Sequence, residues 1–327
     1  MTVVQDRSPG AGRGRVRAAA RLVAITGVAV LTLAGCAMPG GAGSDGPSVV
    51  ATTTVLGDVA GRVAQCGGLD VATLIPVGAD PHDYSPSSAE VRDVVRADLV
   101  IANGLGLEEG LGSALESARE DGATLLEVAP LLEPREMGSA DHDDGDAQNA
   151  DGALDPHVWL DVSRMADAAA LIGAELAQVT GDDALIACGE QVAAELMATD
   201  AEVRAILDAI PEDSRVLVTD HDAFGYFARA YGFEVAGVVI PGGSTMAEPS
   251  SAELAALAAV VREVGVRTIF ANTAHQTVLI EALAAEVGQV GVVELYVESV
   301  GVPGSGAEDY AGMMLTNARL IAQALSA

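Results

Sequence analysis

Short apolar runs alternate along the chain with segments in which apolar residues recur every three or four positions. Six of the runs have the length and composition of buried strands: 71–75, 99–102, 215–219, 235–240, 268–271 and 292–296. The segments between them have the periodicity of amphipathic helices. Strands that alternate with helices predict parallel sheets covered by helices, which is an α/β fold.

A five-residue motif occurs twice and indicates that the fold contains two similar lobes. Pro86 to Glu90 and Pro249 to Glu253 both read Pro-Ser-Ser-Ala-Glu, and each leads through a helical stretch to a strand ending in Ala-Asn. In both copies the first serine and the glutamate three residues later form a capping-box pattern, which satisfies free N–H groups at a helix start. A capping box alone could recur by chance. Because the following strand matches as well, we expect two lobes of the same design.

One long helix is predicted between the lobes. Its apolar stripe recurs at three- and four-residue steps or their sum: Leu185, Cys188, Val192, Leu196, Val203, Ile206 and Ile210. Asp182 or Asp183 can cap its start, and Pro211 ends it. Roughly 27 residues at 1.5 Å each give a rod of about 40 Å. The helix could pack on one lobe only, but its central position favours a rigid connector over 181–210 between lobes at 49–180 and 211–327.

The first 48 residues have the pattern of an export signal followed by a tether. Five arginines precede the apolar run Leu22 to Ala34, which is too short to span a bilayer comfortably and is typical of a signal-peptide core. The run ends in Leu-Ala-Gly-Cys, similar to a lipobox, so residues 1–35 are predicted to be removed and Cys36 to carry lipid. Residues 36–48 are rich in Gly, Pro and Ser and form the lipidated tether. The alternatives are an uncleaved anchor or ordinary secretion.

Composition restricts the partners and the compartment. Net charge is −30, which makes nucleic acid a poor partner, and the 50% hydrophobic content argues against general disorder. Residues 138–152 hold five aspartates around His142 and predict an acidic surface loop, with weak cation collection as an alternative. Outside the cytoplasm, Cys66 and Cys188 are either bridged or two buried thiols, and the sequence leaves both open.

Three of the five histidines stand where strands or turns end. His82 follows the first-lobe run 71–75, His157 lies in the turn Asp-Pro-His-Val-Trp, and His221 follows the run 215–219. Loops at the carboxyl ends of parallel strands present ligand groups in such folds. Taken singly, each is more often a surface or hydrogen-bonded histidine than a metal ligand. Their separations match no local metal signature.

Five motifs follow one another along the chain: Gly78 to Pro86, Asn103 to Glu108, Asp155 to Trp159, His221 to Tyr226, and Ala247 to Ser250. By these motifs and their order, the chain from about residue 47 to its end resembles the zinc and manganese family of substrate-binding lipoproteins that serve ABC importers.

The resemblance implies a metal held between two lobes by four side chains. His82 and His157 take the first-lobe positions, and His221 takes the third, where zinc-type members have histidine and many manganese-type members have a carboxylate. The fourth ligand is usually an aspartate, and Glu298 stands in its place here, with His275 as the rival. Asn272 stands where relatives often have an acid, which would alter the surroundings of the ligands rather than the coordination.

Three imidazoles and one carboxylate suit Zn²⁺, whereas Mn²⁺ prefers a larger share of oxygen. Four protein ligands leave no position for an activated water, so no enzyme activity is expected. The interpretation is a lipid-anchored receptor facing the extracellular or periplasmic side of the cell membrane, which passes Zn²⁺ to an ABC permease and its ATPase. A stiff connector implies release by local loop movement. The alternatives are a manganese or iron receptor, a metal-dependent hydrolase, and a chelate receptor or adhesin.

Overall fold

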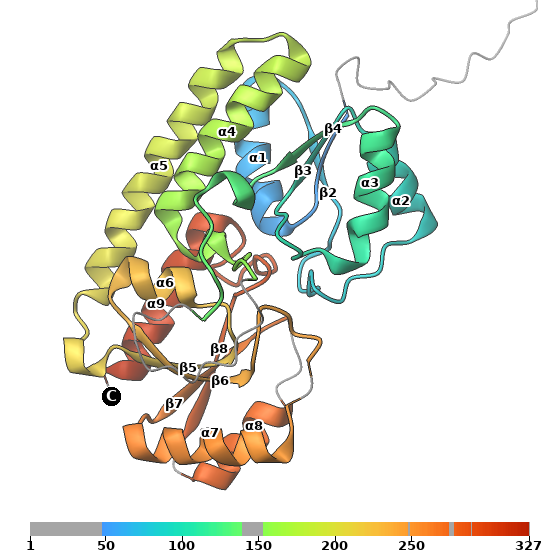
Figure 1. Cartoon of the computed structure of the whole chain (residues 1–327). Helices are drawn as coiled ribbons and strands as arrows, with labels where there is room; N and C mark the ends of the chain where they lie inside the picture. The colour runs from blue at the N-terminus through green and yellow to red at the C-terminus, as the bar shows by residue number, and fades with distance from the viewer. Residues whose placement is uncertain (1–47, 139–152, 248, 275–277, 289, 327) are drawn as a thin grey trace, which may run out of the picture. The chain divides into compact units, whose positions relative to one another are not determined.

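The computed structural model describes residues 48–138, 153–247, 249–274, 278–288 and 290–326. These residues form two lobes, each built on a four-stranded parallel sheet flanked by helices (Figure 1). The predicted α/β class and the two similar lobes are confirmed. Residues 1–35, the tether 36–48 apart from Ser48, and the acidic segment apart from Gly138 lie outside the described residues, as does Cys36.

The first sheet has the strand order β2 (Val71–Thr73), β1 (Val49–Ala51), β3 (Leu99–Ala102), β4 (Thr124–Glu127). Apolar side chains of α2 (Ser88–Val95) and α3 (Gly112–Glu120) pack on one face. α1 (Thr54–Cys66) and α4 (Val162–Thr180) cover the other. Single 3₁₀ turns are η1 (Glu109–Leu111), η2 (Ala129–Leu131) and η3 (Val158–Leu160). The sheet is thus buried on both faces, as parallel sheets require.

The second sheet has the order β6 (Glu234–Ile240), β5 (Val216–His221), β7 (Thr268–Asn272), β8 (Gly291–Leu295). α7 (Ser251–Val264) and α8 (Val278–Val287) pack on one face, and α6 (Gly225–Tyr231) and α9 (Tyr310–Leu325) lie on the other.

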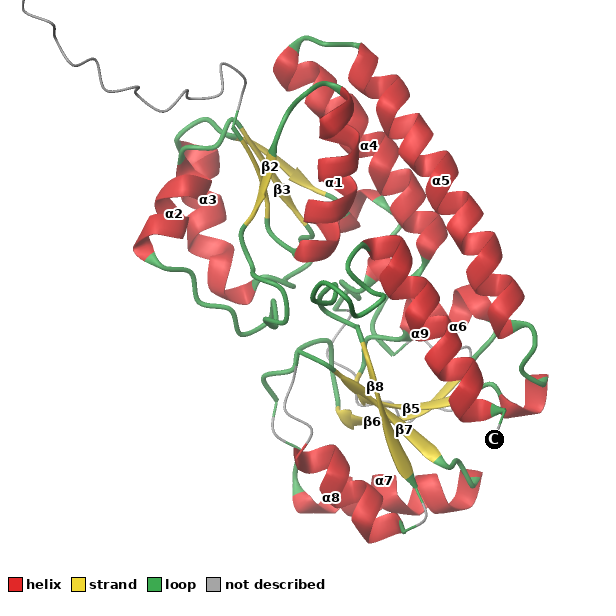
Figure 2. Cartoon of the chain, turned by 180° about the vertical axis from the view of Figure 1, so that it is seen from behind, coloured by secondary structure: helices red, strands yellow, loops and turns green. Residues whose placement is uncertain are grey.

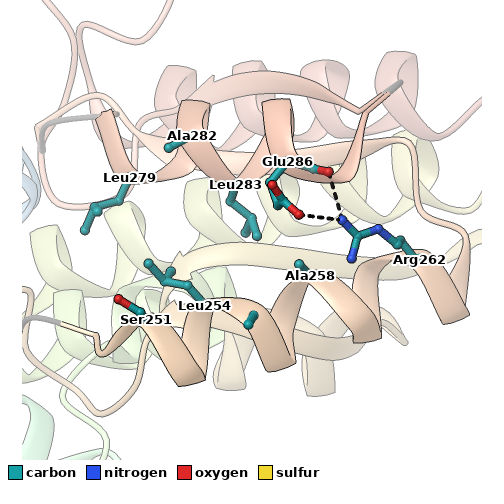
Figure 3. Close-up of a pocket in the computed structure, with 9 residues that line it drawn as sticks. Ser251, Leu254, Ala258, Arg262, Leu279, Ala282, Leu283 and Glu286 are labelled. Atoms are coloured by element: carbon teal, nitrogen blue, oxygen red, sulfur yellow. Dashed lines mark hydrogen bonds and ion pairs between the residues drawn. The ribbon is translucent and has the colours of Figure 1, made fainter.

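Between α7 and α8 runs a groove of about 330 Å³, lined by side chains such as Leu254 and Leu283 (Figure 3). The ion pair between Arg262 and Glu286 spans its edge at 3.2 Å.

The two capping boxes predicted from the repeated motif are present. In α2 the Ser87 hydroxyl accepts from the Glu90 backbone N–H, and the Glu90 carboxylate accepts from the Ser87 backbone N–H. Ser250 and Glu253 make the same pair of bonds in α7. Each box begins the helix that precedes a central strand, so the repeated motif marks the same position in both lobes.

The predicted connecting helix is α5 (Ala184–Leu207), which is followed by the short turn η4 (Glu212–Ser214). The N-cap residue Asp183 makes no side-chain capping bond, but the Asp182 carboxylate before it accepts from the Ala184 backbone N–H at 3.0 Å, at the start of α5. α5 packs on α1 and α4 of the first lobe and on α9 of the second (Figure 2). The close pairing of α5 with α4 was not predicted. It depends on glycine at the contact, because a Cβ atom added at Gly173 would lie 2.8 Å from the Gly189 Cα atom.

One apolar core extends through both lobes along α4 and α5. It includes Leu99 and Ile101 of the first sheet together with Leu217 and Phe270 of the second. Cys66 at the end of α1 and the buried Cys188 in α5 form a disulfide. The shared core makes the lobes one packed body rather than two domains on a flexible linker. Among the described helices, none has the length and apolar character needed to cross a membrane.

Candidate metal centre

His82 lies in the loop between β2 and α2 and is placed by a tight turn. The Asp80 carboxylate Oδ1 accepts a hydrogen bond from the His82 backbone N–H at 2.9 Å, while Pro81 fixes the backbone between them. The side chain of His82 is buried, with 2% of its surface exposed. Neither of its ring nitrogens has a hydrogen-bond partner among the described residues.

His157 is placed by a turn of the same sequence and geometry. The Asp155 Oδ1 atom accepts from the His157 backbone N–H at 2.9 Å, and it also accepts from the ring Nδ1 at 2.8 Å. The following Trp159 donates its indole N–H to the Val297 carbonyl, which ties this turn to the segment after β8. With the Nδ1 proton held by Asp155, the lone pair of Nε2 is free for a cation.

His221 is the last residue of β5, at the carboxyl end of a central strand. The neighbouring Asp220 accepts from its backbone N–H at 2.9 Å and lies 3.1 Å from its Nδ1. The other oxygen of Asp220 accepts from the Asn272 backbone N–H at 3.0 Å, so β7 holds the carboxylate in place. The Nδ2 atom of Asn272 has no partner among the described residues.

Glu298 follows β8 and points its carboxylate at all three rings. Its Oε1 lies 2.9 Å from Nε2 of His221, 3.6 Å from Nε2 of His157 and 3.9 Å from Nε2 of His82. One ligand atom from each of the four residues falls within 4.8 Å of the others, and all four side chains are buried. Within the described part of the chain, Oε2 of Glu298 has no hydrogen-bond partner. Buried polar atoms normally have partners, so atoms without one in a converging set indicate a position for a cation.

Burial and neighbouring charges shift the pKa values of His157 and His221 in opposite directions. Burial holds the pKa of His157 well below its usual value. Burial also opposes protonation of His221, but the charge of Asp220 and hydrogen bonds to Asp220 and Glu298 outweigh it and hold its pKa well above the usual value. Burial raises the pKa of Asp155 to about 7, and burial together with Asp155 raises that of Asp222 to about 6. A bound dication would favour the charged carboxylates and the neutral rings.

The donor set is chemically suited to a borderline metal ion. Three imidazole nitrogens and one carboxylate oxygen from four separate segments of the chain form a closed, four-coordinate set with carboxylates behind two of the rings. Zn²⁺ takes such a set readily, and second carboxylates that orient the rings are typical of its sites. The set resembles a closed binding site rather than an open catalytic one.

The structure brings together four residues singled out from the sequence, His82, His157, His221 and Glu298. His275, the rival fourth ligand, lies outside the described residues. Sequence reasoning did not identify Asp80, Asp155 and Asp220 as residues that position the rings. A signal was present, since each acid stands one or two positions before its histidine and two of the three segments share the letters Asp-Pro-His.

The stretch Asn103 to Glu108 contributes to the scaffold rather than to the ligand set. The Glu108 carboxylate accepts from Thr52 Oγ1 at 2.6 Å and from the backbone N–H groups of Asn103 and Gly104. Asn103 in turn donates its side-chain amide to the Pro156 carbonyl at 2.9 Å. These bonds connect the end of β3 to the turn that carries His157.

Comparison with known proteins gives matches over nearly the whole described region. The model of one protein family, described as "Zinc-uptake complex component A periplasmic", matches residues 49–324. The manganese-binding lipoprotein MntA of Halalkalibacterium halodurans is 29% identical, with 91% of this chain and 96% of that protein covered. The metal ABC transporter substrate-binding lipoprotein FimA of Streptococcus parasanguinis is 27% identical, with 90% and 94% covered.

The zinc-binding protein TroA of Treponema pallidum is 32% identical over 87% of this chain and 91% of that protein. Its solved structure superposes with a TM-score of 0.75 at 31% identity and covers 86% of this chain and 99% of the other. Relatives of this fold are thus named for zinc as well as for manganese.

Proposed function

This chain belongs to the family of periplasmic zinc-uptake components, and on that premise we propose that it is an extracytoplasmic receptor which captures Zn²⁺ and delivers it to an ABC importer. The family consists of metal-binding receptors of ABC transporters and not of enzymes, so the hydrolase alternative is set aside. His82, His157, His221 and Glu298 are the proposed ligands.

One observation carries the choice of zinc over manganese. Three of the four converging donors are imidazole nitrogens, and only the Glu298 carboxylate supplies oxygen. Mn²⁺ favours oxygen-rich sets of higher coordination number, whereas Zn²⁺ accepts a compact set of three nitrogens and one oxygen. Because MntA is named for manganese, the metal of this chain has to be measured rather than transferred from a relative.

The proposed cycle takes place at the membrane surface. Cys36 would carry lipid, and the tether 36–48 would leave the folded part free to meet its permease and the ATPase outside the cytoplasm. The relatives MntA and FimA are named as lipoproteins, which supports this part of the proposal. Labelling with an alkyne fatty acid in the native host, compared between wild type and C36S, tests the anchor directly.

Elemental analysis of the purified protein tests the metal. We expect about one zinc per chain in the wild type and little in His221→Ala, because one of four ligands is lost. His142→Ala is the matched control, since it removes a histidine that the proposed site does not use. Manganese or iron in place of zinc would keep the receptor function and contradict the choice of Zn²⁺ as the transported ion. A folded protein without any metal would contradict the proposal as a whole.

The fourth ligand is tested by two further variants. Glu298→Gln should lose most of the bound zinc because a neutral amide is a poor zinc ligand, while His275→Ala should keep it. The opposite result would make His275 the ligand in place of Glu298.

A further inference from the structure

The loop that carries His82 contacts the second lobe at two points. We call residues 76–84 the His82 segment. At its start, the Gly78 backbone N–H donates to Ser299 Oγ at 2.9 Å, next to the ligand position Glu298. Two residues further on, Thr245 Oγ1 donates to Asp80 Oδ2 at 2.6 Å. The segment thus belongs to the first lobe by sequence and is held against the second lobe by hydrogen bonds.

The two Asp-Pro-His turns use their carboxylates differently. Asp155 directs an oxygen to the ring of its own histidine. Asp80 accepts the His82 backbone N–H with Oδ1 and the Thr245 hydroxyl with Oδ2, and His82 Nδ1 has no hydrogen-bond partner among the described residues. His157 is therefore oriented within its own turn, whereas the placement of His82 depends on how Asp80 is held from the other lobe.

Burial changes within a few residues along the His82 segment. Its first residues are exposed, with Val77 at 45%, while Asp80 and His82 are buried at 4% and 2%. The shared core along α4 and α5 leaves little scope for the lobes to separate as rigid bodies. The segment joins exposed residues directly to a buried ring, so its movement would open His82 to solvent.

We propose that Thr245 is a positioning residue which holds the His82 segment closed through Asp80 and thereby sets the rate at which the bound metal leaves. The proposal rests on the proposed function for its metal readout. Its structural part, the attachment of the segment to the second lobe, does not depend on any metal. A hydroxyl on a buried carboxylate is a charge-assisted hydrogen bond and is among the stronger kinds.

The central variant is Thr245→Val, which keeps the shape of the side chain and removes the hydroxyl. Thr245→Ser restores the hydroxyl and is the rescue variant. Thr180→Val is the matched control, because it removes a threonine hydroxyl that donates to Leu176 O and accepts from the Asp182 backbone N–H between α4 and α5, away from the segment. Zinc dissociation is followed by stopped flow into an excess of a chromogenic chelator. Deuterium uptake of peptides covering 76–84 is measured on metal-free protein.

We expect zinc to leave Thr245→Val about tenfold faster than wild type, and uptake to rise in 76–84 while the rest of the chain is unchanged. Thr245→Ser and Thr180→Val should behave as wild type. In an Asp80→Ala background, Thr245→Val should add less than about twofold, because the acceptor of the Thr245 hydroxyl is already absent.

Two results would overturn the proposal: unchanged dissociation and uptake in Thr245→Val, or a rise in uptake spread over the whole chain, which would mark a general loss of stability. If the wild-type protein binds no zinc, the proposed function fails, and the deuterium measurement still decides whether Thr245 holds the segment.

Discussion

Nε2 of His221 lies 2.9 Å from Oε1 of Glu298, although the two residues are 77 positions apart in the sequence. The same ring contacts Asp220 through Nδ1, so a protonated His221 bridges two carboxylates. In the metal-free protein the proton on Nε2 occupies the direction that a metal would take. Metal and proton therefore compete for this nitrogen.

Zinc binding should weaken as pH falls. The pKa of His221 is raised, so its ring is protonated over a wider range and must lose a proton to bind, whereas His157, with its lowered pKa, is already neutral. We expect between one and two protons released per zinc near pH 7, one from His221 and a part from Asp155, whose pKa is about 7. Titration calorimetry in buffers of different ionisation enthalpy measures this number. Affinity that stays unchanged between about pH 7.5 and pH 5 would contradict a site of three histidines.

Asp155→Asn should weaken zinc binding by about tenfold to 100-fold with little change in the fold. The carboxylate accepts from Nδ1 of His157 at 2.8 Å and so keeps the proton away from Nε2, and an amide provides a weaker, uncharged acceptor. Competition with a chelator of known affinity measures the effect. The control is Asp161→Asn, which alters the N-cap of α4, where asparagine serves as well as aspartate. Equal affinities in the two variants would remove Asp155 from the site.

The contact of α4 with α5 predicts opposite outcomes for two glycines. In Gly173→Ala the new methyl would lie 2.7 Å from the Leu185 carbonyl oxygen, so we expect a loss of about 1–3 kcal/mol in the free energy of unfolding. Gly61 in α1 has nothing within 4 Å of that position, and Gly61→Ala should gain up to about 1 kcal/mol from helix propensity. Urea denaturation of both variants measures the two changes in the free energy of unfolding. If both variants were more stable than the wild type, α4 and α5 would have moved apart at little cost, and the prediction for Gly173→Ala would be wrong.

The disulfide between α1 and α5 should raise the free energy of unfolding. Cys66 and Cys188 enclose a sequence separation of 122 residues, and loop closure of that length is worth up to about 5 kcal/mol in the chain-entropy model. The variant with both cysteines changed to serine should unfold at lower urea concentration than the oxidised wild type. A reducing agent should shift the midpoint of the wild type only. Equal midpoints for oxidised wild type and variant would show that the bond contributes nothing.

The local pattern predicted the elements that have a clear period or a side-chain signal. Six of the eight described strands and both capping boxes follow from short-range sequence, because β-branched runs and Ser-x-x-Glu motifs act on the backbone beside them. β1 (Val49–Ala51) and β4 (Thr124–Glu127) were not predicted. β1 directly follows the predicted tether, and β4 begins and ends with a polar residue, so neither stands out as an apolar run, and both are held by parallel pairing with β3.

For the metal centre, sequence alone placed three histidines at strand and turn exits. Their grouping with Glu298 came from a family resemblance, since residues 82, 157, 221 and 298 share no local spacing. Only the tertiary structure decided that their ligand atoms converge, that Asp155 and Asp220 orient two of the rings, and that Thr245 of the second lobe holds the turn of the third. The physical reason is that a turn is determined by its own few residues, whereas convergence depends on the packing of two lobes around one shared core.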